Sequence, residues 1–288
     1  MATPQQWAVA ISVVVDATAA ATRAAAHAGV EIREFDAMSE FAAITKLYSE
    51  IWRPTAGPLV GAELLRALSK AGNYVAGAYE GAKLVGACVG FFAAPADNAL
   101  HSHIAGVSAT VAGRHVGFAL KLHQRAWALR QKVPVVKWTF DPLVARNAYF
   151  NIGKLGGRPV EYLPNFYGDM NDGINGDDDT DRLLLHWDLT SPQVARACAG
   201  LPQPVDTDVT RGAVFALERD SGGDPVGGTH GARTVLVAVP ADIEKLRVSD
   251  PGRAKEWRTA VREVLGGLLA DDARVTGFDR RGWYVLQR

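Results

Sequence analysis

The spacing of apolar and polar residues along the chain predicts a mixed α/β protein. Alternating or continuous apolar runs typical of strands cover 30–35, 74–79, 83–93, 100–111, 134–140, 160–167 and 183–189. Apolar residues at helical spacing predict helices over 38–52, 61–70 and 145–155, and another helix that follows the turn at 114–119 and reaches 131. The predicted order is therefore one strand, two helices, three strands, one helix, one strand, one helix and two strands.

The first 29 residues predict a helical extension. Thr3 fits an N-cap and Pro4 the first helical position of a helix that reaches about His27. We expect it to pack on the domain or on a partner subunit. The alternative is a secretory signal, but no Lys or Arg precedes the apolar run 7–15, which ends at Asp16. This run is also too short for a membrane span.

The last hundred residues predict a smaller α/β part. A proline-rich join at 191–210 leads to strands over 211–218 and 234–239, helices over 241–246 and 250–269, and a final hairpin that turns at 279–282. This part either packs on the first domain or shares its sheet. The predicted organisation is a helical extension (1–29), a main domain (30–190), the join (191–210) and a C-terminal part (211–288).

Composition narrows the classes of function. The 288 residues include 31 Lys and Arg against 31 Asp and Glu, so no charge excess favours a nucleic-acid or membrane partner. Two cysteines are too few for a disulfide framework or a cysteine zinc site. A cytoplasmic location fits this composition best.

The segment that carries most chemistry runs from Val107, in the fourth strand, through the turn at 114–119 into the helix that reaches Gln131. Gly113, Gly117 and Ala119 lie where the strand hands over to the helix N-terminus. Backbone N–H groups there lack intrahelical acceptors, and small side chains let an anion approach them. The spacing fits neither G-x-G-x-x-G nor a P-loop, since no Gly-Lys-Ser/Thr is present.

The residues Arg114 to Ala119 read R-x-x-G-x-A, which resembles the pyrophosphate motif Arg/Gln-x-x-Gly-x-Gly/Ala of the GNAT acyltransferases. The predicted element order over 30–189 resembles that family too, with the motif after the fourth strand. The resemblance implies a GNAT-like mixed, mostly antiparallel sheet flanked by helices, and acetyl-CoA or another acyl-CoA as co-substrate. The implied pyrophosphate contacts are Arg114, His115, Val116, Gly117, Phe118 and Ala119. The implied pantetheine contacts are the main chain of Val107, Ser108 and Ala109, with Gly106 allowing a β-bulge.

Two histidines on the fourth strand are candidates for proton transfer. His101 and His103 are two residues apart and so share a face. In many GNAT members a Glu acts as general base where His103 stands, and imidazole would suit that task at neutral pH. Alternatively both histidines are hydrogen-bonded beneath a loop. They could also chelate a metal, but no Asp, Glu or Cys completes a ligand set, so no metal is expected.

The segment after the fifth strand is the second candidate region. Asp141 orients a substrate amine or a histidine, or it caps a turn before Pro142. The following RNAYFNIGKLGG resembles the family segment Asn-x-x-Ala-x-x-Leu-Tyr-x-x-x-Gly-Phe. It places Ile152 where the family has the tyrosine that protonates the thiolate, and Ala145 at the asparagine. Tyr149 is the candidate substitute acid, and Asn147 and Asn151, on one helical face, are further candidate contacts of the co-substrate.

The resemblance implies an acyltransferase that moves an acetyl or related acyl group from acyl-CoA to a small amine or amino-acid-like acceptor by direct attack. The pocket between the first two helices would include Trp52 and Arg53. The acidic stretch with Asp169, Asp172 and 177–179 is a solvated linker or a cation-attracting lid. The alternatives to an enzyme are a catalytically degenerate acyl-CoA-binding module and a subunit that acts in an assembly, such as a homodimer.

Overall fold

The computed structural model describes residues 4–55, 57–168, 178–202, 205 and 211–288, with side chains from Ile11 onward. The chain divides into two compact units, which are described separately. Unit 1 comprises Met1–Lys137 and Asp188–Ala199, and unit 2 comprises Trp138–Trp187 and Gly200–Arg288. Strand β5 (Val135–Phe140) begins in unit 1 and ends in unit 2. The domain boundaries predicted from the sequence remain a prediction.

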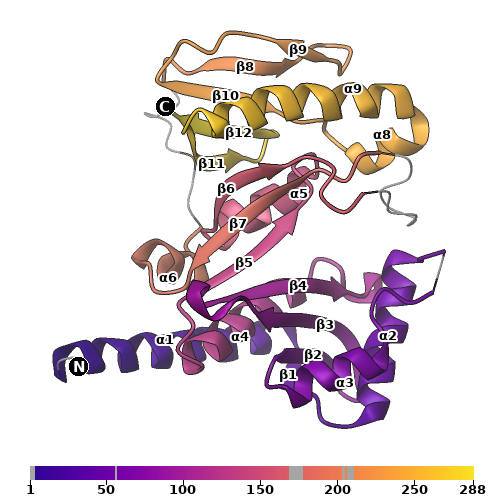
Figure 1. The fold of residues 1–288 in the computed structure, drawn as a ribbon, viewed down its shortest axis with the longest axis vertical. Coiled ribbons are helices and arrows are strands. Elements are labelled where there is room, and N and C mark those ends of the chain that lie inside the picture. Colours follow the sequence, from indigo (N-terminus) through magenta and orange to yellow (C-terminus); the bar gives the residue numbers. More distant parts are fainter. Residues whose placement is uncertain (1–3, 56, 169–177, 203–204, 206–210) are drawn as a thin grey trace. The chain divides into compact units, whose positions relative to one another are not determined.

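Unit 1 holds the first strands and the helices on both sides of them (Figure 1). Its elements are α1 (Pro4–Ala28), β1 (Glu31–Glu34), α2 (Met38–Trp52), α3 (Ala62–Lys70), β2 (Tyr74–Glu80), β3 (Lys83–Phe92), the 3₁₀ turn η1 (Pro95–Asp97), β4 (Ala99–Val107), the 3₁₀ turn η2 (Ala109–Val111), α4 (Val116–Arg130), the start of β5, and α6 (Pro192–Cys198).

The first sheet is mostly antiparallel, and helices flank it. Its strand order is β1-β2-β3-β4-β5-β7-β6, and the β4–β5 pair is parallel. Gly86 and Gly106 show which helix covers each face of unit 1. A Cβ on Gly86 would meet Leu120 and Val116 of α4, whereas one on Gly106 would meet Ile51 and Trp52 of α2. Helix α1 packs against α4, so α4 lies between α1 and the sheet.

Unit 2 contains the end of the first sheet and a second sheet. Its elements are the end of β5, α5 (Ala145–Ala148), the π-helical turn η3 (Tyr149–Lys154), β6 (Arg158–Leu163), β7 (Arg182–Asp188, whose last residue belongs to unit 1), β8 (Val214–Arg219), β9 (Pro225–Gly227), β10 (Thr234–Ala238), α8 (Ile243–Ser249), α9 (Pro251–Val261), the π-helical turn η4 (Arg262–Gly266), α10 (Gly267–Ala270), β11 (Arg274–Asp279) and β12 (Trp283–Gln287). The described strands of the second sheet have the order β11-β12-β10-β8-β9.

The predicted fold class is confirmed: a mixed, mostly antiparallel sheet flanked by helices, plus a smaller C-terminal α/β part. The C-terminal strands form their own sheet, so they do not share the sheet of the first domain, which was one of the two predicted arrangements. The prediction missed α6 inside the proline-rich join. There the Ser191 side chain accepts a hydrogen bond from the Val194 N–H, with Pro192 at the first helical position, an ordinary helix start.

Two further predictions need correction. The fourth strand ends at Val107 instead of continuing to Val111, because the chain turns into η2. The predicted helices 145–155 and 250–269 exist, but each contains a π-helical turn. In η3 the Leu155 N–H donates to the Phe150 carbonyl, five residues back, so α-helical spacing does not hold across this segment.

Candidate functional site

The candidate co-substrate site is built around β4 and the start of α4, both in unit 1. Along β3, Val89 pairs with Ile104 but the next residue, Gly90, pairs with Ser102. His103 is therefore the extra residue of a β-bulge. This corrects the prediction of a bulge at Val107–Ala109: Val107 is still paired with Gly86, and the two residues after it leave the strand for η2.

The other edge of β4 is partnered over only part of its length. In the described residues its parallel pairing with β5 joins Ala99, Leu100 and His101 to Val135, Val136 and Lys137. Strand β4 itself continues to Val107. Along the described part of the chain, the main chain of Ser102–Val107 thus has no partner strand on this edge. An extended amide-bearing molecule could form hydrogen bonds there as an added strand would.

The start of α4 presents backbone donors. His115 is the N-cap residue in a left-handed conformation (φ 64°), and Gly113 two residues earlier also has positive φ (79°). The first N–H groups of a helix have no acceptor inside it and lie at the positive end of its dipole. A Cβ on Gly117 would meet only Val107 Cγ2, at 3.7 Å, so nothing crowds this first turn. The geometry fits a pyrophosphate held by main-chain N–H groups.

Arg114 is held beside this turn by contacts within unit 1. Its Nη1 lies 2.6 Å from Glu80 Oε1, and its Nη2 donates to the carbonyl of Ala28 at the end of α1. His27 of α1 stacks on His115, with ring centroids 5.7 Å apart. These contacts of helix α1 therefore hold Arg114 and His115, the residues directly before α4. Because Glu80 already pairs with Arg114, the backbone N–H groups carry more of the predicted anion binding than this arginine does.

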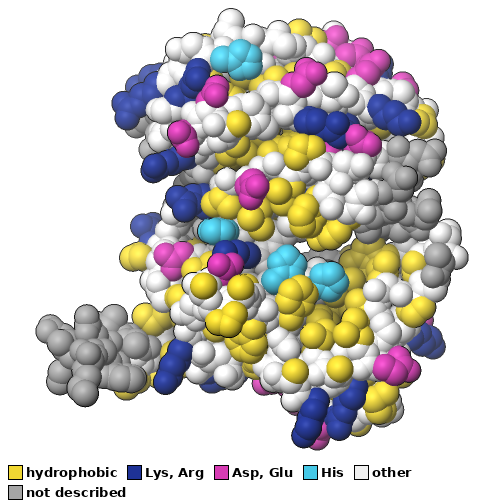
Figure 2. Space-filling model, viewed as in Figure 1, with side chains coloured by type: hydrophobic (Ala, Val, Ile, Leu, Met, Phe, Trp, Pro, Cys, Tyr) yellow, Lys and Arg dark blue, Asp and Glu magenta, His cyan; other side chains and the backbone are white. Residues whose placement is uncertain are grey.

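The two histidines of β4 are brought together as predicted. Phe91 of β3 contacts both rings, with centroids 5.0 Å from His101 and 5.7 Å from His103, and the two imidazoles are 6.1 Å apart. His103 is exposed and His101 half-buried. Figure 2 shows histidine side chains at the surface next to hydrophobic ones.

The surroundings keep both imidazoles neutral at pH 7. Desolvation lowers the pKa of His103 below its ordinary value of 6.5. Desolvation, followed by the charges of His103 and Lys121, lowers the pKa of His101 to about 4. An exposed neutral imidazole can accept a proton, which is what a general base requires.

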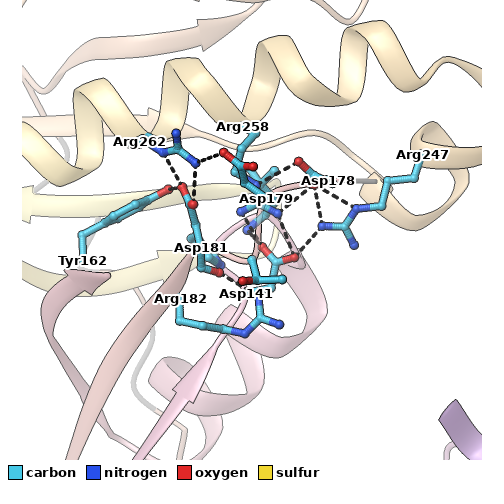
Figure 3. A network of polar contacts seen from close by, with 12 residues as sticks. Asp141, Tyr162, Asp178, Asp179, Asp181, Arg182, Arg247, Arg258 and Arg262 are labelled. Atoms are coloured by element: carbon cyan, nitrogen blue, oxygen red, sulfur yellow. Dashed lines mark hydrogen bonds and ion pairs between the residues drawn. The ribbon is translucent and has the colours of Figure 1, made fainter. Parts of the chain in front are cut away.

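Asp141 lies in unit 2 within a buried network of ion pairs (Figure 3). Arg258 donates to both carboxylate oxygens at 3.0 Å, and Arg247 donates to Oδ2 at 2.6 Å. Asp141 Oδ1 also accepts from the Leu143 N–H, which is the turn cap foreseen as the alternative. Burial alone would raise the pKa of Asp141, but the two arginines outweigh it and hold the pKa well below 3.8. This pairing disfavours the predicted role of Asp141 toward a substrate amine.

The described end of the acidic loop belongs to the same network. Asp178 accepts from Arg247 and Arg258, and Arg262 binds Asp179 and Asp181 (Figure 3). The solvated-linker reading is therefore wrong for Asp178 and Asp179, because they are paired with arginines of α8, α9 and η4. Asp169, Asp172 and Asp177 lie outside the described residues. The sequence analysis did not identify these arginines. The only signal in the sequence is the four-residue spacing of Arg258 and Arg262, which is typical of one helical face.

The residues predicted on the helix after β5 differ in their surroundings: Asn147 lies in α5, whereas Tyr149 and Asn151 lie in the π-helical turn η3. Asn147 is exposed, whereas Asn151 is buried and accepts from Trp138 Nε1 at 3.3 Å. Of the two predicted contacts, only Asn147 therefore lies at the surface. The Tyr149 hydroxyl accepts from Arg280 Nη2 at 2.6 Å, and that guanidinium also lies over the Tyr149 ring. Ile152, at the family tyrosine position, is buried.

At the predicted acceptor pocket, Trp52 packs its ring over Gly106, where any Cβ would lie 2.6 Å from it. Arg53 ends α2 in a left-handed conformation and is exposed. Among the described residues, no group of three His, Cys, Asp or Glu side chains is arranged to hold a metal ion. No described helix is long and apolar enough to cross a membrane.

Comparison with family models and with curated proteins finds no match for this chain. Several solved structures are similar. The ribosomal-protein-S18-alanine N-acetyltransferase of Escherichia coli shares 12% identity with a TM-score of 0.46, covering 56% of this chain and 95% of its own. An N-acetyltransferase from Staphylococcus aureus Mu50 shares 15% identity with a TM-score of 0.46, covering 56% and 98%.

A third similar structure is a proposed acetyltransferase from Salmonella typhimurium, solved with its cofactor acetyl-CoA, at 16% identity and a TM-score of 0.46, covering 56% of this chain and 94% of its own. All these identities are low and the TM-scores lie below 0.5. What this protein does has to be inferred from its own residues.

Proposed function

We propose that the protein is a GNAT-type acyltransferase that moves an acetyl or related acyl group from acyl-CoA to a small amine or amino-acid-like acceptor. The observation that carries this proposal is the continuity of two features in unit 1. The edge of β4 after His101 has no partner strand among the described residues, and the chain then enters α4, whose first N–H groups donate no hydrogen bond to the side chain of the N-cap residue His115. Together they suit a molecule with an amide-bearing arm and a pyrophosphate.

The co-substrate would be held mainly by main-chain groups. The free edge of Ser102–Val107 would pair with the amides of the pantetheine arm, and the first turn of α4 from Val116 to Ala119 would hold the pyrophosphate. The space over Gly117 supports this fit, since a Cβ there would meet only Val107. Acyl-CoA supplies the activated thioester; the chain's own residues orient it and handle protons.

The proposed proton acceptor is His103. An attacking amine must lose a proton, and a neutral imidazole at the bulge of β4 can accept it directly or through water. The bulge also turns main-chain groups out of the β3 ladder, where an N–H could stabilise charge on the thioester oxygen. Phe91 and His101 lie beside His103, with ring centroids 5.7 and 6.1 Å from that of His103.

The proposed acid for the leaving thiolate is Tyr149. Arg280 donates to its hydroxyl oxygen, so the phenolic proton remains available to a second acceptor. Ile152 cannot take this role because its side chain has no proton to give. The second candidate function, an acyl-CoA-binding module without turnover, is favoured by that buried Ile152 and uses the same co-substrate site.

The test is release of free CoA. We expect the purified chain with acetyl-CoA to release CoA thiol when one of a panel of small amines and amino acids is added. Changing His103→Gln should lower kcat/KM by about 10²-fold to 10⁴-fold. The wild-type rate should fall on the acid side with a midpoint below pH 6.5, because protonated His103 cannot accept a proton.

Each outcome separates the two candidates. Saturable binding of acetyl-CoA without thiol release by any amine would replace the enzyme with the binding module. Thiol release that His103→Gln leaves unchanged would keep the transferase and remove His103 as its base. A His101→Gln variant is the matched control, since it alters the neighbouring imidazole but leaves the proposed base in place.

A further inference from the structure

A lysine is buried on the side of β4 opposite to the histidine pair. Lys121 of α4 is 5% exposed, and its ammonium donates to Ser102 Oγ at 3.0 Å and to Gln124 Oε1 at 2.8 Å. Gln124 in turn donates to Cys88 Sγ at 3.4 Å. Burying a lysine charge is costly, and a side chain kept there calls for an explanation beyond packing.

This polar cluster lies directly behind the bulge. Ser102 comes directly before His103, the extra residue at which the pairing of β4 with β3 shifts by one. A Cβ on Gly90, the β3 partner of Ser102, would lie 3.2 Å from Gln124 Nε2, so position 90 faces α4 and its glycine admits the cluster. Phe91, the next residue, therefore faces the opposite side, where it contacts both histidine rings.

We propose that Lys121 is a positioning residue for the histidine pair: through Ser102 it holds the bulged part of β4 against α4, so that His101 and His103 are presented together on the other face as neutral imidazoles. The inference deepens the proposed function, because it assigns a residue that prepares the proposed base. The claim that Lys121 holds β4 against α4 depends only on the contacts of Lys121 with Ser102 and Gln124.

Electrostatics supports the same arrangement. The charge of Lys121 contributes to the lowered pKa of His101, after desolvation and the charge of His103. Burial lowers the pKa of Lys121 itself to about 8, so the ammonium is still charged at pH 7. Other titratable or charged groups described near this part of the sheet include Cys88 on β3, Tyr48 on α2, Tyr74 on β2 with its partner His123 on α4, and Lys137 on β5 with its partner Asp97.

The experiment is a histidine titration by NMR on the full chain without any ligand. In Lys121→Met, which keeps an unbranched side chain that is one atom shorter and removes its charge, the pKa of His101 should rise by about half a unit or more. Lys121→Arg keeps a positive charge and should leave the pKa nearly unchanged.

A second variant covers the case that Lys121→Met does not fold. Ser102→Ala removes a single oxygen, releases the ammonium from the strand, and should raise the pKa of His101 by a smaller amount. Unchanged titration of His101 in a folded Lys121→Met or Ser102→Ala protein overturns the proposal. Because this assay needs no acyl-CoA, its failure is distinct from failure of the proposed function.

Discussion

The first turn of α4 offers the sharpest perturbation, because changes at Gly117 separate folding from binding. Gly117 is the second residue of α4, has no acidic neighbour in that turn, and leaves space for a side chain. A glutamate there should be neutral or stabilising for the fold, since it replaces a poor helix former and places a negative charge at the positive end of the helix dipole. The same carboxylate would lie within a few ångströms of the proposed pyrophosphate site.

The size of the effect follows from charge repulsion. Two unit charges about 4 Å apart repel by roughly 1 kcal/mol in water and roughly 4 kcal/mol near a protein surface. We therefore expect Gly117→Glu to weaken acetyl-CoA binding by about 5-fold to about 700-fold, since about 1.4 kcal/mol is a factor of ten. The matched variant is Gly117→Ala, whose Cβ meets only Val107 at 3.7 Å. It should bind nearly as the wild type does.

The assay pairs calorimetric titration of acetyl-CoA with thermal unfolding of the same samples. The expected result is an unfolding temperature of Gly117→Glu at or above that of the wild type, together with much weaker binding. Wild-type affinity in a folded Gly117→Glu protein would refute the assignment of the pyrophosphate to the start of α4. Equal loss in Gly117→Ala would mean that bulk, not charge, is what the site excludes.

Two further predictions concern unit 2. Asp141→Asn should lower the free energy of unfolding by about 3–5 kcal/mol, because it leaves buried arginines without their full partner; chemical denaturation measures this, and the exposed Asp36→Asn change should have no measurable effect. Because the pKa of Asp141 is held below its ordinary value, its contribution is complete above about pH 4 and is lost as the pH falls further. Wild-type stability should therefore drop more steeply below pH 4 than that of Asp141→Asn, and parallel curves would contradict the pairing. Tyr149→Phe should lower kcat by about 10²-fold if this hydroxyl protonates the leaving thiolate, and an unchanged rate would exclude it.

Much of the fold is readable from local pattern. Apolar spacing places the helices and strands of 30–189 because each buries one face, and the R-x-x-G-x-A segment marks the strand-to-helix junction that the structure has after β4. The sequence analysis missed helix α6 because it lies in a proline-rich segment, although Ser191 and Pro192 form an ordinary helix start. The π-helical turn η3 carries no local signal that separates it from an α-helix, and the burial of Asn151 against Trp138 depends on a residue of β5.

The site is less readable because its arrangement depends on distant partners. The bulge at His103 arises from a register shift against β3, which strand alternation does not encode. Asp141 and Arg258 are more than a hundred residues apart in the sequence, and only the tertiary fold pairs them. A sequence pattern shows Lys121 merely as a polar residue on a helix, whereas the structure buries it behind the proposed base.

The most direct test of the account is calorimetric titration of the wild-type chain with acetyl-CoA, with free CoA and adenosine diphosphate as comparisons. The proposed site holds both the pyrophosphate and the pantetheine arm. We therefore predict micromolar binding of acetyl-CoA and of CoA, and weaker binding of adenosine diphosphate, which lacks the arm that pairs with β4. Absence of binding by all three would contradict the acyl-CoA site and leave the likeness to acetyltransferases as a matter of fold alone.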